Sequence, residues 1–170
     1  MRETRKTRII HEALETYERV MGHTTLLKDA HALYKELWRE FDRNGWIIRS
    51  GAEKFVAIKG SVVAKWGRKN NYSLDPIGET LRFYDELDHK GLRKLRPRVY
   101  ATRENLIVEQ RCRTVKYQDM TPVHQRAWDD VAAAVRRFAN DIHEGNIGWV
   151  GDQAKVFDAL MYDRVRGTER

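Results

Sequence analysis

Three polar residues in the last third of the sequence have the types and spacing needed for phosphate and metal chemistry. Asp141 is followed five positions later by Asn146, and Asp158 comes twelve positions after Asn146. Carboxylate and amide oxygens are hard ligands of the kind that Mg²⁺ binds. The protein commonly supplies only one or two of these ligands, and water or phosphate oxygens complete the coordination shell. With Asn146 and Asp158 in that role, Asp141 remains to accept a proton from an attacking hydroxyl.

A hairpin between the last two of these residues explains how they can meet. The segment 147–158 predicts a strand, a tight turn at Gly151-Asp152 and a second strand that ends at Asp158. Before it, apolar residues from Trp128 to Ala139 recur at helical spacing. Asp141 and Asn146 should therefore lie in a loop after a helix, with Asp158 brought back beside Asn146.

The rest of the sequence predicts an α+β fold in the order αα–βββ–α–ββ–α–ββ. The first two helices are expected at 9–21 and 26–41, with Thr24 or Thr25 as the cap of the second and Gly45 after its end. A third helix should start at Pro76 and close at Gly91. Short β-branched runs predict the strands of a meander and of a second hairpin, at 46–49, 54–59, 62–66, 96–102 and 105–112.

Composition limits the classes of protein to which such a site can belong. The 170 residues carry a net charge of +7, which favours anionic partners such as nucleotides, nucleic acids or an acidic protein. A single cysteine, Cys112, excludes an internal disulfide and fits a reducing compartment. No signal peptide and no apolar run of transmembrane length are present, so the expected location is the cytoplasm.

The segment Asp141-Ile-His-Glu-Gly-Asn146, followed by Val156-Phe-Asp158, resembles the catalytic loop and metal-binding Asp of protein-kinase-like phosphotransferases. Its His143 brings it closer to the aminoglycoside-phosphotransferase branch, and the short chain is similar in size to small bacterial or bacteriophage kinase-like proteins. The resemblance implies ATP and Mg²⁺ as cofactors. The resemblance also implies that Asp141 is the catalytic base and that Asn146 and Asp158 bind the metal ion.

The same resemblance extends to the predicted meander and the helix after it. Lys65 in "VVAKW" has the place of the kinase lysine that binds nucleotide phosphates, and Glu79 has the place of its ion-pair partner. Lys59 in "VAIK" is the alternative lysine, because those four letters also match the kinase motif. The family pattern therefore favours Lys65 and keeps Lys59 open.

Contacts with adenine are implied for the end of the second hairpin. Glu109 would offer a backbone carbonyl and Arg111 a backbone N–H, while Val108 would lie at the entrance to an inner pocket. Gly51 is the one glycine of the expected phosphate-covering loop, "RSGAEK". The implied domains are a helical extension (1–45), a kinase-like N-lobe (46–111) and a minimal C-lobe (112–170).

Departures from the family pattern leave three functions open. The phosphate-covering loop is poor in glycine, Asp158 is followed by Ala-Leu, and only twelve residues remain after it. The first alternative is an ATP- and Mg²⁺-dependent phosphotransferase, and the second is an inactive pseudokinase that binds a partner protein. The third and least favoured is a basic nucleic-acid-binding protein. No membrane is expected as a partner. Each site residue also has an ordinary explanation: a surface ion pair for Lys65 and Glu79, a loop cap for Asp141, and a tight turn for Asn146 beside Gly145.

Overall fold

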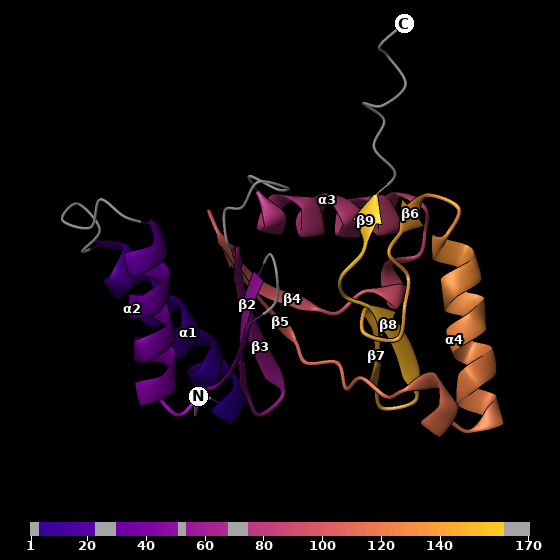
Figure 1. The fold of residues 1–170 in the computed structure, drawn as a ribbon, viewed down its shortest axis with the longest axis horizontal. Helices are drawn as coiled ribbons and strands as arrows, with labels where there is room; N and C mark the ends of the chain where they lie inside the picture. The colour runs from indigo at the N-terminus through magenta and orange to yellow at the C-terminus, as the bar shows by residue number, and fades with distance from the viewer. Residues whose placement is uncertain (1–3, 23–29, 51–53, 68–74, 162–170) are drawn as a thin grey trace, which may run out of the picture. The chain divides into compact units, whose positions relative to one another are not determined.

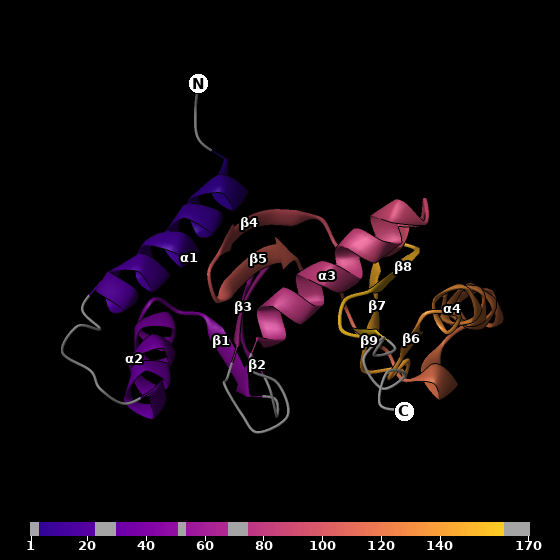
Figure 2. The same ribbon diagram turned by 90° about the horizontal axis from the view of Figure 1, so that it is seen from above.

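The chain has an α+β fold (Figures 1 and 2). It comprises two compact units: the first contains the residues up to Gly78 together with Arg98–Arg111, and the second contains Glu79–Pro97 and the residues from Cys112 onward. The computed structural model describes residues 4–22, 30–50, 54–67 and 75–161. The predicted N-terminal helical extension and the sheet of the predicted N-lobe thus belong to one unit, and the three-part division stays a prediction.

The first unit opens with two helices, α1 (Arg5–Gly22) and α2 (Ala30–Arg43). Their buried apolar residues recur three or four positions apart, which places them on one stripe of each helix. These residues are Ile9, Ala13, Tyr17 and Val20 on α1, and Tyr34, Leu37 and Phe41 on α2. Both predicted helices are confirmed, whereas the predicted caps Thr24 and Thr25 lie outside the described residues.

The end of α2 follows from the backbone freedom of glycine. Trp46 donates its N–H to the Phe41 carbonyl (3.0 Å), and Gly45 donates to the Asp42 carbonyl (2.8 Å). This pair of bonds is a Schellman motif, which needs a left-handed residue at the helix end. Gly45 supplies that residue with φ of 75°.

A five-stranded antiparallel sheet follows, in the order β1-β2-β3-β5-β4. The predicted meander and second hairpin are both present in it. The strands are β1 (Ile47–Ser50), β2 (Lys54–Lys59), β3 (Val62–Gly67), β4 (Val99–Arg103) and β5 (Leu106–Gln110).

The helix pair covers one face of this sheet, as Figures 1 and 2 show. Side chains alternate between the faces of a strand, and every second residue of β2, β3 and β5 joins the core beneath the helices. These core residues are Phe55, Ala57, Val62, Ala64, Trp66, Leu106 and Val108. The remaining residues of β3 and β5, among them Lys65 and Glu109, therefore face away from α1 and α2.

The second unit contains the rest of α3 (Pro76–His89), a 3₁₀ turn (η2, Arg93–Leu95), a second 3₁₀ turn (η3, Tyr117–Asp119) and α4 (Pro122–Val135). The predicted hairpin is present as β7 (Ile147–Val150) and β8 (Gln153–Val156). Two short strands that the sequence did not predict, β6 (Ala139–Asn140) and β9 (Leu160–Met161), pair with each other.

The predicted extent of the last helix is wrong at its C-terminal end. The helical pattern continues to Ala139, but α4 ends at Val135. Phe138 donates its N–H to the Val135 carbonyl (3.0 Å), which is a tight turn instead of a further helical turn. The turn frees Ala139 and Asn140 to pair with β9, so strand pairing overrides helical spacing here.

No helix among residues 4–22, 30–50, 54–67 and 75–161 is both long and apolar enough to cross a membrane.

A bidentate ion pair between Arg96 and Asp88 holds the segment after α3 against the end of that helix. Arg96 donates from Nε to Asp88 Oδ1 (2.8 Å) and from Nη2 to Asp88 Oδ2 (2.7 Å). The hydrogen bond from Arg96 holds the pKa of the Asp88 carboxyl below its ordinary value of 3.8. Because this pKa is lowered by folding, the pair stabilises the unit above pH 3.8 and loses its effect as the pH falls through the folded-state pKa.

We therefore expect Asp88→Asn to lower the free energy of unfolding at pH 7 by about 1 kcal/mol. Below pH 3.8 the difference from the wild type should shrink, because Asp88 itself becomes protonated there. Urea unfolding between pH 7 and pH 2.5 measures both quantities. Asp130→Asn, an exposed position on α4, is the control and should leave stability unchanged; a pH-independent deficit in Asp88→Asn would contradict the prediction.

Candidate functional site

Two short ladders in the second unit enclose the predicted catalytic loop. Asn140 pairs with Leu160 in β6–β9, and Ile147 pairs with Val156 in β7–β8. The segments 141–146 and 157–159 lie between these two pairs, so they form opposite sides of one closed loop. Phe157 also donates its N–H to the carbonyl of Asn146 (3.1 Å). The structure thus brings Asn146 beside the residue that precedes Asp158.

Asp158 itself lies slightly beyond its expected place. The sequence predicts it at the end of the second hairpin strand, but β8 ends at Val156 and Asp158 is in the bend that follows. Tyr84 of α3 donates its hydroxyl to the Phe157 carbonyl (3.1 Å). Phe157 is therefore held through both its backbone N–H and its carbonyl, which restrains the neighbouring, half-buried Asp158.

The Asn146 side chain links the two ends of the catalytic loop. Its Nδ2 donates to the Asp141 carbonyl (2.8 Å) and to Asp141 Oδ2 (3.1 Å), and the residue is only 8% exposed. Both bonds use the amide nitrogen, so the carbonyl Oδ1 is the polar atom of the side chain that remains for a cation. The backbone N–H of Asn146 closes a turn onto the His143 carbonyl (2.9 Å). Asn146 thus lies in a tight turn, as its place beside Gly145 suggested, and its side chain also bonds Asp141.

Asp141 occupies an unusual backbone conformation. Its φ is 59°, the left-handed region that costs an L-residue roughly 1–2 kcal/mol and that Asp tolerates better than most. The carboxylate is half-exposed, with Oδ2 bonded to Asn146 and Oδ1 3.5 Å from Nε2 of His143. Such strain is commonly retained at functional sites. The carboxylate is oriented from two sides while staying accessible.

A cavity of about 390 Å³ opens directly beside this carboxylate. Arg136, Ala139, Asn140, Asp141, Ile142 and His143 line it. A neighbouring cavity of about 350 Å³ lies along residues 114–116 and 143–145. His143 lines both, so it stands between the two hollows.

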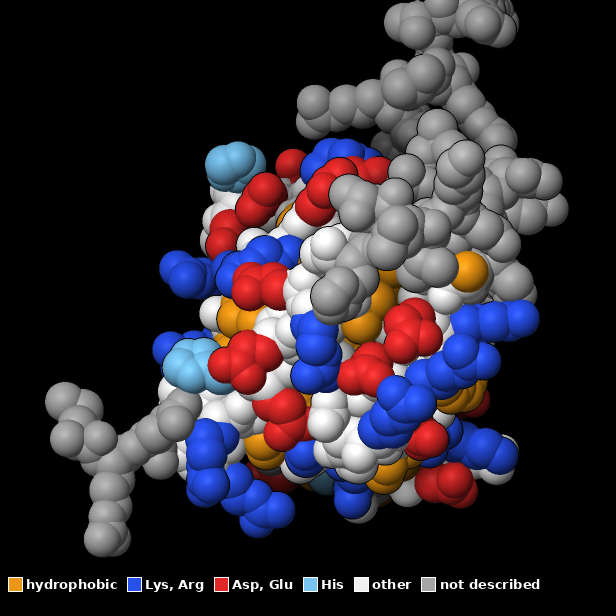
Figure 3. Space-filling view, turned by 90° about the vertical axis from the view of Figure 1, so that its left-hand side faces the viewer, with side chains coloured by type: hydrophobic (Ala, Val, Ile, Leu, Met, Phe, Trp, Pro, Cys, Tyr) orange, Lys and Arg blue, Asp and Glu red, His pale blue; other side chains and the backbone are white. Residues whose placement is uncertain are grey.

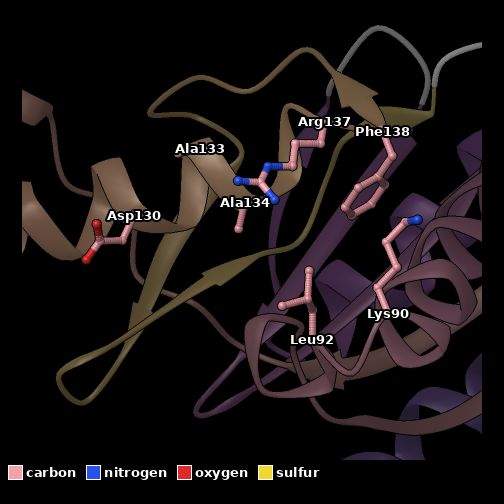
Figure 4. A pocket seen from close by; sticks show the side chains of 7 residues that line it. All are labelled: Lys90, Leu92, Asp130, Ala133, Ala134, Arg137 and Phe138. Carbon is pink, nitrogen blue, oxygen red and sulfur yellow. The ribbon is translucent and has the colours of Figure 1, made fainter.

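A third cavity, of about 490 Å³, contains none of the predicted site residues. Figure 4 shows it between the end of α3 and α4, with the Phe138 ring beside the Lys90 side chain. Lys90 Nζ lies 5.0 Å from the centre of that ring and 3.0 Å from Glu86 Oε1. The lining thus combines apolar side chains with the charged side chains of Lys90, Asp130 and Arg137.

The donors in the loop suit a cation that carries most of its own ligands. Among the described residues, no group of three or more His, Cys, Asp or Glu side chains is arranged to hold a metal ion. Asn146 Oδ1 and the Asp158 carboxylate are the two groups that the kinase resemblance assigns to the metal. One amide and one carboxylate match the protein share of a typical Mg²⁺ shell.

In the first unit, Lys65 forms a buried ion pair. Its Nζ lies 2.6 Å from Glu109 Oε1, and the residues are 5% and 1% exposed. Both side chains face away from the helix pair, and Val63, two positions from Lys65, is the cross-strand partner of Glu109. The sequence did not predict Glu109 as the side-chain partner of Lys65. Glu79 lies in the first turn of α3, in the second unit, and its pairing with Lys65 stays a prediction.

The alternative lysine has a structural partner of its own. Lys59 Nζ lies 2.7 Å from both Glu12 Oε1 of α1 and the Asn44 carbonyl. Trp46 donates to the same Glu12 carboxylate (2.6 Å). Lys59 therefore ties β2 to the helix pair, on the face opposite Lys65.

The residues expected around adenine are placed differently from one another. Val108 packs in the core beneath the helices, so it faces away from Lys65, whereas Glu109 shares the face of Lys65. Arg111 donates its N–H to the Ser61 carbonyl (2.9 Å), so this donor is already engaged within the unit. Gly51 lies outside the described residues.

No protein-family model matches the chain, and no curated protein matches it either.

The buried ion pair predicts a large cost for losing one partner. Lys65→Met should lower the free energy of unfolding by about 3–5 kcal/mol, because Glu109 would stay charged and buried without its cation. The double variant Lys65→Met/Glu109→Leu should be clearly more stable than Lys65→Met alone, since it removes both charges. Urea denaturation measures the three chains. Arg43→Met, which breaks the exposed pair with Glu40, is the control and should cost less than 1 kcal/mol.

The conformation of Asp141 predicts an inverted preference for glycine. Asp141→Gly and Asp141→Ala both delete the carboxylate, but Gly tolerates φ of 59° and Ala does not. The Gly variant should be more stable by about 1 kcal/mol in thermal or urea unfolding. At Asp130, inside α4, the same pair of substitutions should favour Ala by a similar amount. Equal or reversed stabilities at position 141 would contradict the strained conformation.

Proposed function

We propose that this chain is an ATP- and Mg²⁺-dependent phosphotransferase with a truncated protein-kinase-like fold. The observation that carries the proposal is the linked loop in which Asn146 bonds the Asp141 carboxylate through its side chain and Phe157 through its backbone. The order of elements also supports it: three strands, a helix, two strands, a helix, the loop and a hairpin occur in the sequence order that the kinase resemblance implies.

The loop residues divide the chemistry among themselves. Asp141 accepts the proton of the acceptor hydroxyl, since its carboxylate is half-exposed and oriented. Asn146 Oδ1 and Asp158 would hold Mg²⁺, which when bound neutralises charge on the phosphate oxygens. Catalysis of this kind depends mainly on positioning and charge stabilisation, which suits a loop restrained at both ends.

Lys65 is the favoured phosphate-binding lysine, because it lies on the sheet face away from the helix pair, whereas Lys59 is bonded to Glu12 of α1 on the covered face. Its orienting carboxylate within the first unit is Glu109. Glu79 stays a second predicted partner. The cavity beside Asp141, about 390 Å³, lies within the usual size range of small-molecule sites, which supports a small hydroxyl-bearing acceptor.

An inactive pseudokinase is the second candidate, and two observations favour it. Lys65 is sequestered by Glu109, and the Arg111 N–H is bonded to Ser61, so two groups that would contact the nucleotide are engaged. Nucleotide binding would require both to exchange partners. A chain that binds a partner protein and transfers no phosphate needs no such exchange.

A nucleic-acid-binding role has less support. Figure 3 shows Lys and Arg side chains interleaved with Asp and Glu on the face that includes the helix pair. On α1 and α2, Arg19 and Arg43 are both paired with Glu40. In the segment after α3, Arg96 is likewise held by Asp88. Paired cations contribute little to phosphate neutralisation, on which such binding depends.

ATP with MgCl₂ should raise the unfolding midpoint of the wild-type chain. At tenfold excess over Kd the gain is about 1.4 kcal/mol, a shift of roughly 3–6 °C. Asp158→Asn should abolish the Mg²⁺-dependent part of this shift, whereas Asp141→Asn should keep the shift and lose transfer of radiolabelled phosphate. Asp130→Asn is the matched control. No shift at millimolar ATP and Mg²⁺ would contradict nucleotide binding, and a shift without any transfer would favour the pseudokinase.

A further inference from the structure

His143 has a fixed arrangement of its two ring nitrogens. Gly145 donates its backbone N–H to His143 Nδ1 at 3.0 Å. A nitrogen that accepts a hydrogen bond carries no proton in the neutral imidazole, so the proton lies on Nε2. Nε2 is the atom 3.5 Å from Asp141 Oδ1. The backbone of the loop thus selects the tautomer that directs an N–H toward the carboxylate.

Glycine at position 145 is what permits this contact. A Cβ added there would lie 2.7 Å from His143 Cε1 and 2.9 Å from Nδ1, closer than real Cβ contacts allow. The histidine ring would have to move, and its Nε2 would move with it away from Asp141. The requirement is steric and local to the ring, because this glycine has no positive φ.

The other loop residues hold the frame around the ring. Glu144 accepts the backbone N–H of Tyr117 (2.8 Å), and Asn146 donates its own to the His143 carbonyl (2.9 Å). The backbone of His143 is therefore fixed while its ring stays half-exposed between two cavities. A ring held in this way can orient a neighbour without being buried.

We propose that His143 is a positioning residue: locked by the Gly145 N–H as the Nε2–H tautomer, it fixes Oδ1 of Asp141 while Asn146 fixes Oδ2. The carboxylate would otherwise rotate about its bond to Cβ. The separation of 3.5 Å is longer than an ideal hydrogen bond, as catalytic contacts often are before substrate binds. This inference rests on the proposed function, in which Asp141 accepts the proton of the acceptor.

The tautomer can be measured without any activity. Long-range ¹H–¹⁵N correlation spectra of the uniformly labelled chain at pH 8 should show His143 with an unprotonated Nδ1 and a protonated Nε2. The resonance is assigned by its absence in His143→Gln. Gly145→Ala should shift both nitrogens toward the averaged values of a free imidazole, while Gly22→Ala, where a Cβ meets nothing within 4 Å, should leave them unchanged.

The positioning role is measured by kinetics of phosphate transfer from ATP. His143→Leu and Gly145→Ala should each lower kcat about 10–100-fold with little change in the KM for ATP, and the double variant should be no worse than either. His143→Gln keeps an N–H donor near the Nε2 position and should recover most of the lost kcat. His89→Gln, at the exposed end of α3, is the control.

Three results would overturn the inference. The first is a protonated Nδ1 in the wild-type spectrum, which removes the lock. The second is an unchanged kcat in both His143→Leu and Gly145→Ala. The third is that the wild-type chain transfers no phosphate. The His143–Asp141 contact would then position no catalytic base, and the proposed function would be wrong as well. The spectrum separates this last case, since a correct tautomer then shows that the geometry is right and only the function is wrong.

Discussion

The side chain of Asn146 is the constraint on which the candidate site depends. Its amide nitrogen donates to both the backbone carbonyl and the carboxylate of Asp141, while the backbone carbonyl of the same residue accepts the Phe157 N–H. A nearly buried amide must satisfy its hydrogen-bonding groups or destabilise the fold. The loop conformation and the left-handed Asp141 therefore satisfy the donors of this one side chain, and the backbone bond from residue 157 closes the loop at the same residue. A residue of the same size without the amide would lose both bonds to Asp141 and keep only the backbone bond to Phe157.

The main elements could be predicted from the sequence because their signals are local. Helical spacing located α1, and the glycines at 45 and 91 marked where α2 and α3 end, each with a left-handed φ. The strands β6 and β9 could not be found in this way, because two residues are too few to show any periodicity and Ala139 and Asn140 pair with the distant Met161 and Leu160. The same limit explains the false continuation of α4 to Ala139. In each case a long-range pairing, which leaves no local pattern, decided the structure.

For the candidate site, the residue types were predictable and the partners were not. Asp141, Asn146 and the chain next to Asp158 come together as their spacing suggested, because a hairpin is a short-range device. The partner of Lys65 depends instead on the register of β3 against β5, which places Glu109 on its face and Val108 on the other. A shift of one residue exchanges the two faces of a strand. No pattern within either strand specifies that register. Tyr84 was also missed: the sequence predicts only that it lies on the apolar face of a helix, and not that its hydroxyl bonds Phe157.

The ladder between β6 and β9 comprises two residue pairs among the described residues, whereas the β7–β8 hairpin inside the same loop comprises four. Short ladders open at a smaller free-energy cost than the structure around them, by local fluctuation instead of global unfolding. Opening this one would leave the turn at Asn146 intact while releasing the chain beyond Phe157. The amide protons of Ala139–Asn140 and Leu160–Met161 should then exchange with solvent well before those of the hairpin. The stability of the β6–β9 ladder therefore sets the fraction of time in which residues 141–146 and 157–159 lie on opposite sides of a closed loop.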